Sequence, residues 1–310
     1  MALNILYRGP AERGQHWQTL FAQHLPQVKW HNWPEVDDNS AIDMLVCWIP
    51  PRDYQQDYPN LKVLFSVGAG VDQLNIATVP KELQVVRMLD PGIQQGMTEF
   101  VQMSVLNIHR DTLAYVNMNQ RGQWQQLPGV STAKRQIGIM GLGNLGQAAA
   151  LGLQNLGFSV HGWSKRPKVL PDMQCFHGND QLKVFLQQCD IVVCLLPLTD
   201  ETRGILNQHT LACLPKGASV INVGRGEHIV EHDLLNLLNQ QHLRYAVLDV
   251  FAKEPLQADH PFWQHPQIWV TPHIAAITQN DSAGLALLAN VQRYINKDTM
   301  VGVVDLNAGY

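Results

Sequence analysis

Residues 136–157 read QIGIMGLGNLGQAAALGLQNLG, and this stretch decides the fold. QIGIM is a short apolar run typical of a buried strand, and the stretch after the glycines has the pattern of a helix. In such a strand–turn–helix unit the glycines let the backbone approach a pyrophosphate, whose charge is favoured at the helix N-terminus. A glycine-rich turn without a ligand is the alternative, and the flanking strand and helix argue against it. We therefore predict a dinucleotide-binding loop of Gly141, Gly143, Asn144, Leu145 and Gly146.

The stretch FSVHGWSKRPK, residues 158–168, predicts which dinucleotide this loop binds. In folds of this kind an acidic residue about 20 residues beyond the glycines binds the ribose 2′-hydroxyl. Here the apolar run ends in Ser164, Lys165 and Arg166, and the stretch contains no Asp or Glu. An acid would repel a 2′-phosphate, whereas a hydroxyl and two cations would bind it. We predict NADPH as the cofactor and weaker use of NADH; the alternative is two solvated cations in a surface turn.

Strand-like and helix-like segments alternate along the chain, which is the pattern of α/β proteins. In the first hundred residues, strands are expected at 3–7, 44–48 and 62–67. From Gln136 onward, strands are expected at 137–140, 158–163, 191–196, 218–223, 245–250 and 268–271. The helices between these strands are expected near 145–156, 180–188, 207–213 and 231–240. Between the two series, residues 97–121 lack Pro and Gly and predict one long helix; a last helix is expected at 281–296, before the strand-like MVGVV.

These segments predict an α/β protein of two Rossmann-like domains, each a doubly wound parallel sheet. The boundary is expected within the long helix, and the C-terminal helix is expected to return to the first domain. Residues 1–98 with 280–310 would form the first, flavodoxin-like domain, and residues 99–279 the dinucleotide-binding Rossmann domain.

The composition excludes several classes of protein. The chain has 310 residues, a hydrophobic content of 45% and a net charge of −4, so the basic excess of a nucleic-acid-binding protein is absent. We find no signal peptide, and apolar runs such as IVVCLLPL are too short to span a bilayer. Five cysteines, an odd number without a CxxC pair, fit a reducing cytoplasm.

Three polar residues follow three predicted strands of the second series. Arg225 lies between two glycines in INVGRG, Glu254 in LDVFAKEPL and His273 in TPHIAA. Carboxyl ends of parallel strands meet at the edge where such sheets bind ligands. Arginine can bind a carboxylate through two parallel hydrogen bonds, and a glutamate beside a histidine orients the ring and favours its protonated form. The alternatives are a surface arginine and a structural histidine, one of 13 in the chain.

Residues 228–232, HIVEH, match the HxxEH pattern of a class of zinc proteases. Zinc would need both histidines on one face of a helix. The segment after Gly226 reads as a loop, and the helix is expected to begin around Glu231, which would leave His228 outside it. We therefore predict no metal site.

The ordered motifs SVGAGVD, GLGNLG, LLPLTDETRGIL, NVGRG, LDVFAKEPL and TPHIAA resemble the D-isomer-specific 2-hydroxyacid dehydrogenases over nearly the whole chain. WIPP, WSKR, FWQHP, TPHIAAIT and the terminal GY are similar to bacterial glyoxylate/hydroxypyruvate reductases of the A type. The resemblance implies NADPH-dependent reduction of glyoxylate to glycolate and of hydroxypyruvate to D-glycerate by hydride transfer. One departure is Ile49, where similar reductases have histidine; another is Gly224, often alanine in the family, which is expected to matter little.

The resemblance also implies a role for each motif residue. Arg225 would bind the substrate carboxylate and polarise the keto group, His273 would donate the proton, and Glu254 would support His273. The first domain would be the substrate-binding domain, contacting the oxo acid through Trp48, Gly68, Ala69 and Gly70. Further cofactor contacts would come from Leu196, Pro197, Val223 and Asp249, the last near the nicotinamide carboxamide.

The resemblance further implies a homodimer, in which Trp124 would reach the active site of the partner chain. A Trp124 packed within its own chain is the alternative. Two other functions stay open at this point: a dinucleotide-sensing, corepressor-like binding protein, and a dehydrogenase of the family for another small 2-oxo acid.

Overall fold

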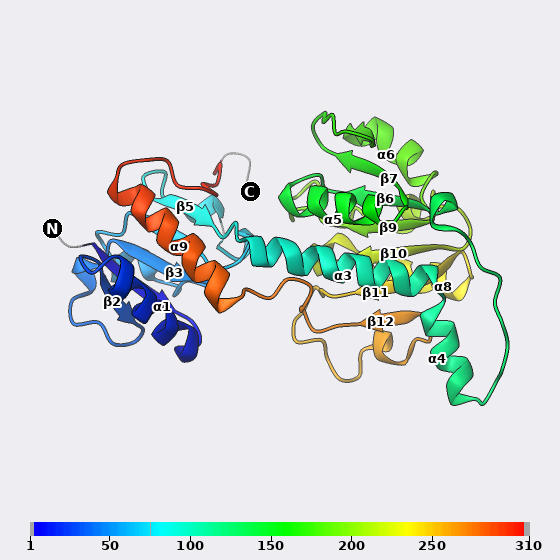
Figure 1. The fold of residues 1–310 in the computed structure, drawn as a ribbon, viewed down its shortest axis with the longest axis horizontal. Helices are drawn as coiled ribbons and strands as arrows, with labels where there is room; N and C mark the ends of the chain where they lie inside the picture. The colour runs from blue at the N-terminus through cyan, green and yellow to red at the C-terminus, as the bar shows by residue number, and fades with distance from the viewer. Residues whose placement is uncertain (1–2, 75, 307–310) are drawn as a thin grey trace. The chain divides into compact units, whose positions relative to one another are not determined.

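The computed structural model describes residues 3–74 and 76–306, which form two compact units. The first unit holds the described residues up to Ile93 and those from Ile277 onward; the second unit is Gln94–Ala276. Each unit is an α/β structure built on one parallel sheet, as the sequence predicts (Figure 1).

The first unit has a five-stranded sheet of order β2-β1-β3-β4-β5, and all neighbouring strands are parallel. Its strands are β1 (Asn4–Arg8), β2 (Lys29–Asn32), β3 (Met44–Cys47), β4 (Val63–Ser66) and β5 (Gln84–Arg87). This is the flavodoxin-like order. Every residue of β3 and β4 is buried, because a parallel sheet is covered on both faces.

The C-terminal helix returns to the first unit. There α9 (Asn280–Ile295) packs against α1 (Ala11–His24), while the short helix α2 (Tyr54–Asp57) follows β3. Trp17 of α1 is fully buried, and its indole N–H donates to the carbonyl oxygen of Asn280 at 2.8 Å. A Cβ added at Gly284 would stand 2.8 Å from the Trp17 ring, so glycine lets the two helices come close.

The second unit has a seven-stranded parallel sheet of order β12-β11-β10-β9-β6-β7-β8. Its strands are β6 (Gln136–Met140), β7 (Ser159–Ser164), β8 (Gln174–His177), β9 (Ile191–Cys194), β10 (Ala218–Asn222), β11 (Leu243–Leu248) and β12 (Ile268–Val270). Counted from β6, this is the Rossmann order extended by one strand. The order reverses between β6 and β9, and this fold binds ligands at the carboxyl ends of strands beside such a reversal.

Helices cover both faces of the second sheet. One apolar core lies under α3 (Pro91–His109) and α5 (Asn144–Asn155). The other lies under α6 (Gly178–Leu186), α7 (Gln208–Leu211) and α8 (Glu231–Asn239). Throughout the described chain, no helix is both long and apolar enough to cross a membrane.

The single helix expected over 97–121 is wrong. The structure has α3 and a separate α4 (Thr112–Gln120), and α3 begins earlier, at Pro91, a residue favoured in a first helical turn. Between the two helices Asp111 adopts a left-handed backbone with φ 58°, a conformation that Asp tolerates better than most residues. An ion pair between Asp111 and Arg244 holds this break in place.

The strand expected at MVGVV is also wrong. This segment follows α9 as turns, and its strand pairing with the first sheet is a single antiparallel bridge between Val303 and Val86. A glycine with φ 90° at position 302 turns the chain there, which interrupts an extended strand.

Candidate active site

The glycine loop follows β6 and leads into α5. Gly141 has φ 103°, and a Cβ there would stand 2.6 Å from the carbonyl oxygen of Leu195. A Cβ at Gly146 would stand 1.8 Å from the carbonyl oxygen of Gly141, so α5 meets the loop only because this residue is glycine. Among the described residues, no side chain caps α5 at Gly143 and nothing lies within 4 Å of a Cβ added there. The open helix end has the amides and the space that a pyrophosphate needs.

Apart from Asp249, which follows β11, the predicted cofactor residues gather at the carboxyl ends of four neighbouring strands. Main-chain hydrogen bonds of 2.8, 2.8 and 3.1 Å join the end of β6 to β7, the end of β6 to β9, and the end of β9 to β10. They place the glycine loop beside Leu196 and Pro197, which follow β9, and near Val223, which follows β10. These loops flank the reversal of strand order.

Ser164, Lys165 and Arg166 lie at the end of β7, one strand from the glycine loop. Ser164 is buried, and its hydroxyl donates to the carbonyl oxygen of Arg166 at 2.8 Å, so it shapes the turn. Lys165 and Arg166 are exposed, and the Lys165 ammonium lies 2.6 Å from the carboxylate of Glu201, in the loop after β9. Both cations therefore stand at the surface of this turn, with one carboxylate beside them.

Lys168 is a further cation at this turn that the sequence pattern does not single out. Its ammonium donates to the carbonyl oxygen of Leu142 in the glycine loop. Only the folded strands bring these two loops together, so no spacing along the chain marks Lys168.

His273 and Glu254 form the contact that the sequence predicts. The Nδ1 atom of His273 lies 2.8 Å from Oε2 of Glu254, and Oε1 of Glu254 accepts the backbone N–H of Phe251 at 3.0 Å. The backbone N–H of Phe251 thereby orients the carboxylate, and the carboxylate orients the imidazole ring. Because Nδ1 faces Glu254, the proton that His273 can offer to a ligand is on Nε2.

Asp249 holds the turn that carries His273. Its buried carboxylate accepts hydrogen bonds of 2.7, 2.9 and 2.8 Å from the Thr271 hydroxyl and the backbone N–H groups of Ile274 and Ala275. His273 has a left-handed backbone with φ 54°, and its N–H donates to the Asp249 carbonyl oxygen at 2.9 Å. Burial raises the pKa of Asp249, and the three hydrogen bonds oppose that rise.

Replacing Asp249 with alanine is therefore expected to destabilise the protein by roughly 2–4 kcal/mol, because buried donors lose their acceptor. The variant should also lose turnover at temperatures where it stays folded, since His273 loses its anchor. Urea unfolding and steady-state kinetics measure the two effects. A folded variant with unchanged stability and turnover would show that the turn does not depend on Asp249.

Arg225 follows β10 in a loop that contacts the loop after β11. A Cβ added at Gly226 would stand 1.9 Å from the carbonyl carbon of Phe251, so the two loops touch at this glycine. The Arg225 guanidinium donates to the carbonyl oxygen of Gly224 at 2.8 Å. Arg225, Glu254 and His273 thus come from adjacent loops at the sheet edge that carries the glycine loop.

In the first unit, Gly68, Ala69 and Gly70 form a turn after β4. The Ser66 hydroxyl lies 3.2 Å from the carbonyl oxygen of Gly68 and 3.0 Å from that of Gly70, which fixes the turn. Within the described part of the chain, no backbone group accepts a hydrogen bond from the amides of Ala69 and Gly70. A Cβ at Gly68 would stand 2.4 Å from the Trp48 ring, so the half-exposed indole lies against this turn.

Trp124 does not pack against the described residues of its own chain. Its side chain is fully exposed, with a relative accessibility of 104%, in the loop after α4 that stands away from the second sheet (Figure 1). The hydroxyl of Tyr115 in α4 accepts the backbone N–H of Leu127 at 2.9 Å and ties this loop to the helix.

HIVEH is not arranged as a zinc-binding helix. His228 lies in a 3-10 turn, Gly226–His228, whereas α8 begins at Glu231, so the two histidines do not share a helix. In the part of the chain that the structure describes, no group of three or more His, Cys, Asp or Glu side chains is placed to hold a metal ion.

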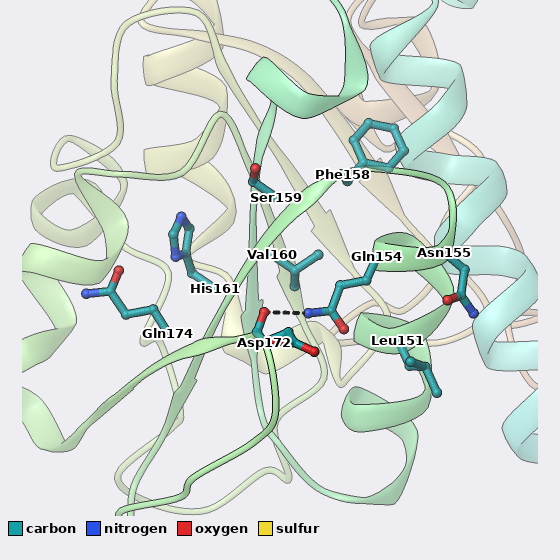
Figure 2. Close-up of a pocket in the computed structure, with 9 residues that line it drawn as sticks. All are labelled: Leu151, Gln154, Asn155, Phe158, Ser159, Val160, His161, Asp172 and Gln174. Atoms are coloured by element: carbon teal, nitrogen blue, oxygen red, sulfur yellow. Dashed lines mark hydrogen bonds between the residues drawn. The ribbon is translucent and has the colours of Figure 1, made fainter.

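A pocket of about 520 Å³ lies at the opposite edge of the second sheet (Figure 2). It is lined by the start of β7, including His161, and by the end of α5, where the Gln154 amide donates to the carbonyl oxygen of Asp172 at 2.8 Å. Burial lowers the pKa of His161. None of the predicted catalytic or cofactor residues lines this pocket.

Comparison with known proteins agrees with this geometry. The sequence model described as "D-isomer specific 2-hydroxyacid dehydrogenase, NAD binding domain" matches residues 102–275. The chain is 38% identical to glyoxylate/hydroxypyruvate reductase A of Serratia proteamaculans and 36% identical to that of Yersinia enterocolitica. Each alignment covers 99% of this chain and 100% of the relative.

Solved structures give the same result. A D-isomer-specific 2-hydroxyacid dehydrogenase from Xanthobacter autotrophicus, in complex with NADPH and MES, superposes with a TM-score of 0.94 at 36% identity. An NADPH-dependent glyoxylate/hydroxypyruvate reductase from Sinorhizobium meliloti, in complex with NADP and sulfate, superposes with a TM-score of 0.91 at 34% identity. Both matches cover 100% of each chain. With the glycine loop, the Arg225 loop and the His273–Glu254 pair at one sheet edge, these matches show that the chain belongs to the D-isomer-specific 2-hydroxyacid dehydrogenase family.

Proposed function

We propose that the protein is an NADPH-dependent reductase of small 2-oxo acids, converting glyoxylate to glycolate and hydroxypyruvate to D-glycerate. The observation that carries the proposal is the 2.8 Å contact between His273 and Glu254, at the sheet edge that also holds the glycine loop. The similarity to glyoxylate/hydroxypyruvate reductases supports the choice of substrate.

The residues at this edge fit NADPH. Gly141, Gly143 and Gly146 leave the amide end of α5 open to the pyrophosphate. Lys165 and Arg166 provide positive charge for a 2′-phosphate at the end of β7, where an acid would repel it. When bound, NADPH supplies a hydride to the keto carbon of the substrate.

Arg225 and His273 act on the oxo acid. The guanidinium of Arg225 binds the substrate carboxylate through two parallel N–H donors and polarises the keto group. His273 donates its Nε2 proton to the keto oxygen, and the Glu254 carboxylate stabilises the charged imidazole before donation and holds Nδ1–H afterwards. In the first unit, we propose that the amides of the turn 68–70 bind the oxo acid and that Trp48 contacts it.

Turnover tests this proposal against a corepressor-like binding protein of the same fold. The purified protein should oxidise NADPH when glyoxylate or hydroxypyruvate is added, in an absorbance assay against a panel of 2-oxo acids. Tight NADPH binding without turnover of any oxo acid would favour the binding protein. Turnover confined to a different oxo acid would keep the family chemistry and replace the substrate.

We also propose a homodimer in the cytoplasm. The exposed Trp124 and further exposed apolar side chains lie on α3, α4 and the following loop; these are Met103, Tyr115, Val116 and Val130. Exposed apolar side chains that gather in a patch are typical of an interface, and these residues are the support for the proposed dimer. The free cysteines support a reducing compartment.

Sedimentation at assay concentration should therefore give a dimer. Replacing Trp124 with alanine should leave the melting temperature nearly unchanged, because the side chain is fully exposed among the described residues, and should raise KM for the oxo acid. The matched control is Val169→Ala, also an exposed apolar residue of the second unit, which should change neither the mass nor KM. A monomer with full activity would contradict the role of Trp124.

A further inference from the structure

His228 is a buried polar residue that the roles assigned above leave unexplained. It lies three positions beyond Arg225, at the end of the 3-10 turn Gly226–His228, and its relative exposure is 0%. Its Nδ1 atom accepts the backbone N–H of Arg225 at 3.0 Å, and its Nε2 atom lies 3.2 Å from the carbonyl oxygen of Pro197. With Nδ1 as the acceptor, the proton of the neutral ring is on Nε2 and is donated to Pro197.

The two contacts join the loops that the proposed function uses. Arg225 lies in the loop after β10, and Pro197 in the loop after β9, beside the glycine loop. A single imidazole therefore connects the main chain of the proposed carboxylate ligand to the main chain of a proposed cofactor residue. Both hydrogen bonds are shielded from water, so neither loop can exchange its partner for solvent without exposing the ring.

The main chain of Arg225 is held from its other side by a second buried side chain. The Asn222 amide donates to the carbonyl oxygen of Arg225 at 2.8 Å, and its oxygen accepts the N–H of Gly224 at 3.2 Å. Asn222 and His228 thus bind the carbonyl and the N–H of the same residue. Together they fix the direction in which the Arg225 side chain leaves the loop.

Gly224 lies beside this arrangement. A Cβ added there would stand 2.9 Å from Nδ1 of His228 and 3.0 Å from the carbonyl oxygen of Leu196. A side chain at this position would press on the ring at the atom that binds Arg225. At position 224, where the sequence leads us to expect that glycine matters little, an added Cβ would meet the His228 ring.

We propose that His228 is a positioning residue for substrate binding: its Nδ1 atom holds Arg225 in the orientation that binds the substrate carboxylate, and its Nε2–H holds the Pro197 loop. The inference rests on the proposed role of Arg225. It predicts that loss of the Nδ1 hydrogen bond mainly lowers the affinity for the oxo acid. Loss of the Nε2 hydrogen bond should mainly lower the affinity for the cofactor.

Two substitutions separate the effects of the hydrogen bonds that the two ring nitrogens make. In His228→Asn the side-chain oxygen can replace Nδ1 as the acceptor for Arg225, and in His228→Gln the terminal amide can replace Nε2–H as the donor to Pro197. The readouts are the dissociation constants of NADPH and, with NADPH saturating, of oxamate, an unreactive analogue of a 2-oxo acid. His228→Gln should weaken oxamate by about three- to tenfold and His228→Asn by less, the fold-change expected for one lost hydrogen bond. NADPH affinity should fall more in His228→Asn than in His228→Gln.

Gly224→Ala provides an independent variant that keeps the imidazole. Made alone, it should lower the affinity for oxamate. In the His228→Asn background, where the side chain at position 228 is shorter, it should lower that affinity by a smaller factor. Melting temperatures of all variants show whether each is folded in the assay. A loss of stability alone would weaken both ligands together and would not reverse their order.

Equal weakening of oxamate in folded His228→Asn and His228→Gln, or no weakening in His228→Gln, would overturn the inference. These outcomes are distinct from failure of the proposed function. An unmodified protein that binds oxamate but reduces no oxo acid contradicts the proposed reductase while the comparison of His228 variants still decides the role of the ring. An unmodified protein that does not bind oxamate contradicts both.

Discussion

Replacing His273 with alanine is expected to lower kcat by roughly 10²–10⁴-fold, the usual contribution of a general acid. The reason is that Nε2 of His273 carries the proton donated to the keto oxygen, and no other group takes its place in the proposed mechanism. NADPH affinity should persist, because the glycine loop and the turn at 164–166 lie after other strands. Rapid-mixing kinetics and a fluorescence titration with NADPH measure the two quantities.

Glu254→Gln is the matched control for this experiment. Its amide oxygen can still accept the N–H of Phe251, but the amide group facing Nδ1 can no longer stabilise a charged imidazole. We expect a loss of kcat smaller than that of His273→Ala. Near-normal turnover in folded His273→Ala would remove His273 from the mechanism, whatever the control shows.

Replacing Ser164 with aspartate is expected to shift the cofactor preference from NADPH toward NADH by roughly tens- to hundreds-fold, as the ratio of the two kcat/KM values. An aspartate at the end of β7 repels a 2′-phosphate and accepts hydrogen bonds from an unmodified ribose. Charged hydrogen bonds are each worth about 1.5–3 kcal/mol, and every 1.4 kcal/mol is roughly a factor of ten. Because Ser164 is buried and its hydroxyl already binds the Arg166 carbonyl oxygen, its direct contribution to a phosphate is smaller than that of the cations.

The cations are tested separately. Arg166→Ala should lower the affinity for NADPH and leave the affinity for NADH nearly unchanged. Glu201→Gln should strengthen NADPH, because the glutamate carboxylate that pairs with Lys165 at 2.6 Å no longer competes with the phosphate. Equal use of NADH by the unmodified protein, or an unchanged preference in Ser164→Asp, would contradict the assignment of this turn.

The sequence predicts the central strands and the glycine loop well, and the physical reason is burial. Strands β9 and β10 are buried along their whole length and mostly apolar, because helices cover both faces of the sheet. The strands that the sequence does not reveal are β2, β5 and β8, and each of them is an outermost strand of its sheet. An edge strand is partly open to solvent and carries polar residues, as KWHN in β2 and QCFH in β8 show, so it lacks a continuous apolar run.

The break at Asp111 shows a different limit. Residues 97–121 contain no Pro or Gly, the strongest signals that a helix ends, and the pattern alone predicts continuity. What interrupts the helix is a left-handed Asp paired with Arg244, which lies in β11. A tertiary contact of this kind leaves no mark in local spacing.

In the candidate site, too, residues in local motifs can be predicted from the sequence, and contacts between distant loops cannot. Gly141, Arg225 and His273 follow strands in recognisable motifs, and their placement at one sheet edge follows from the parallel fold. Contacts between loops are not predictable in this way. The pairing of Lys165 with Glu201 and the bridge made by His228 depend on which strands become neighbours, and the order β9-β6-β7 brings together segments far apart in the sequence.

The configuration of the product tests the central claim most directly. The unmodified protein would be incubated with hydroxypyruvate and NADPH, and the glycerate formed would be resolved by chiral chromatography. The account predicts D-glycerate as the product, formed in one-to-one proportion with the NADPH oxidised. Formation of L-glycerate or of a racemic mixture, or oxidation of NADPH without glycerate, would contradict it.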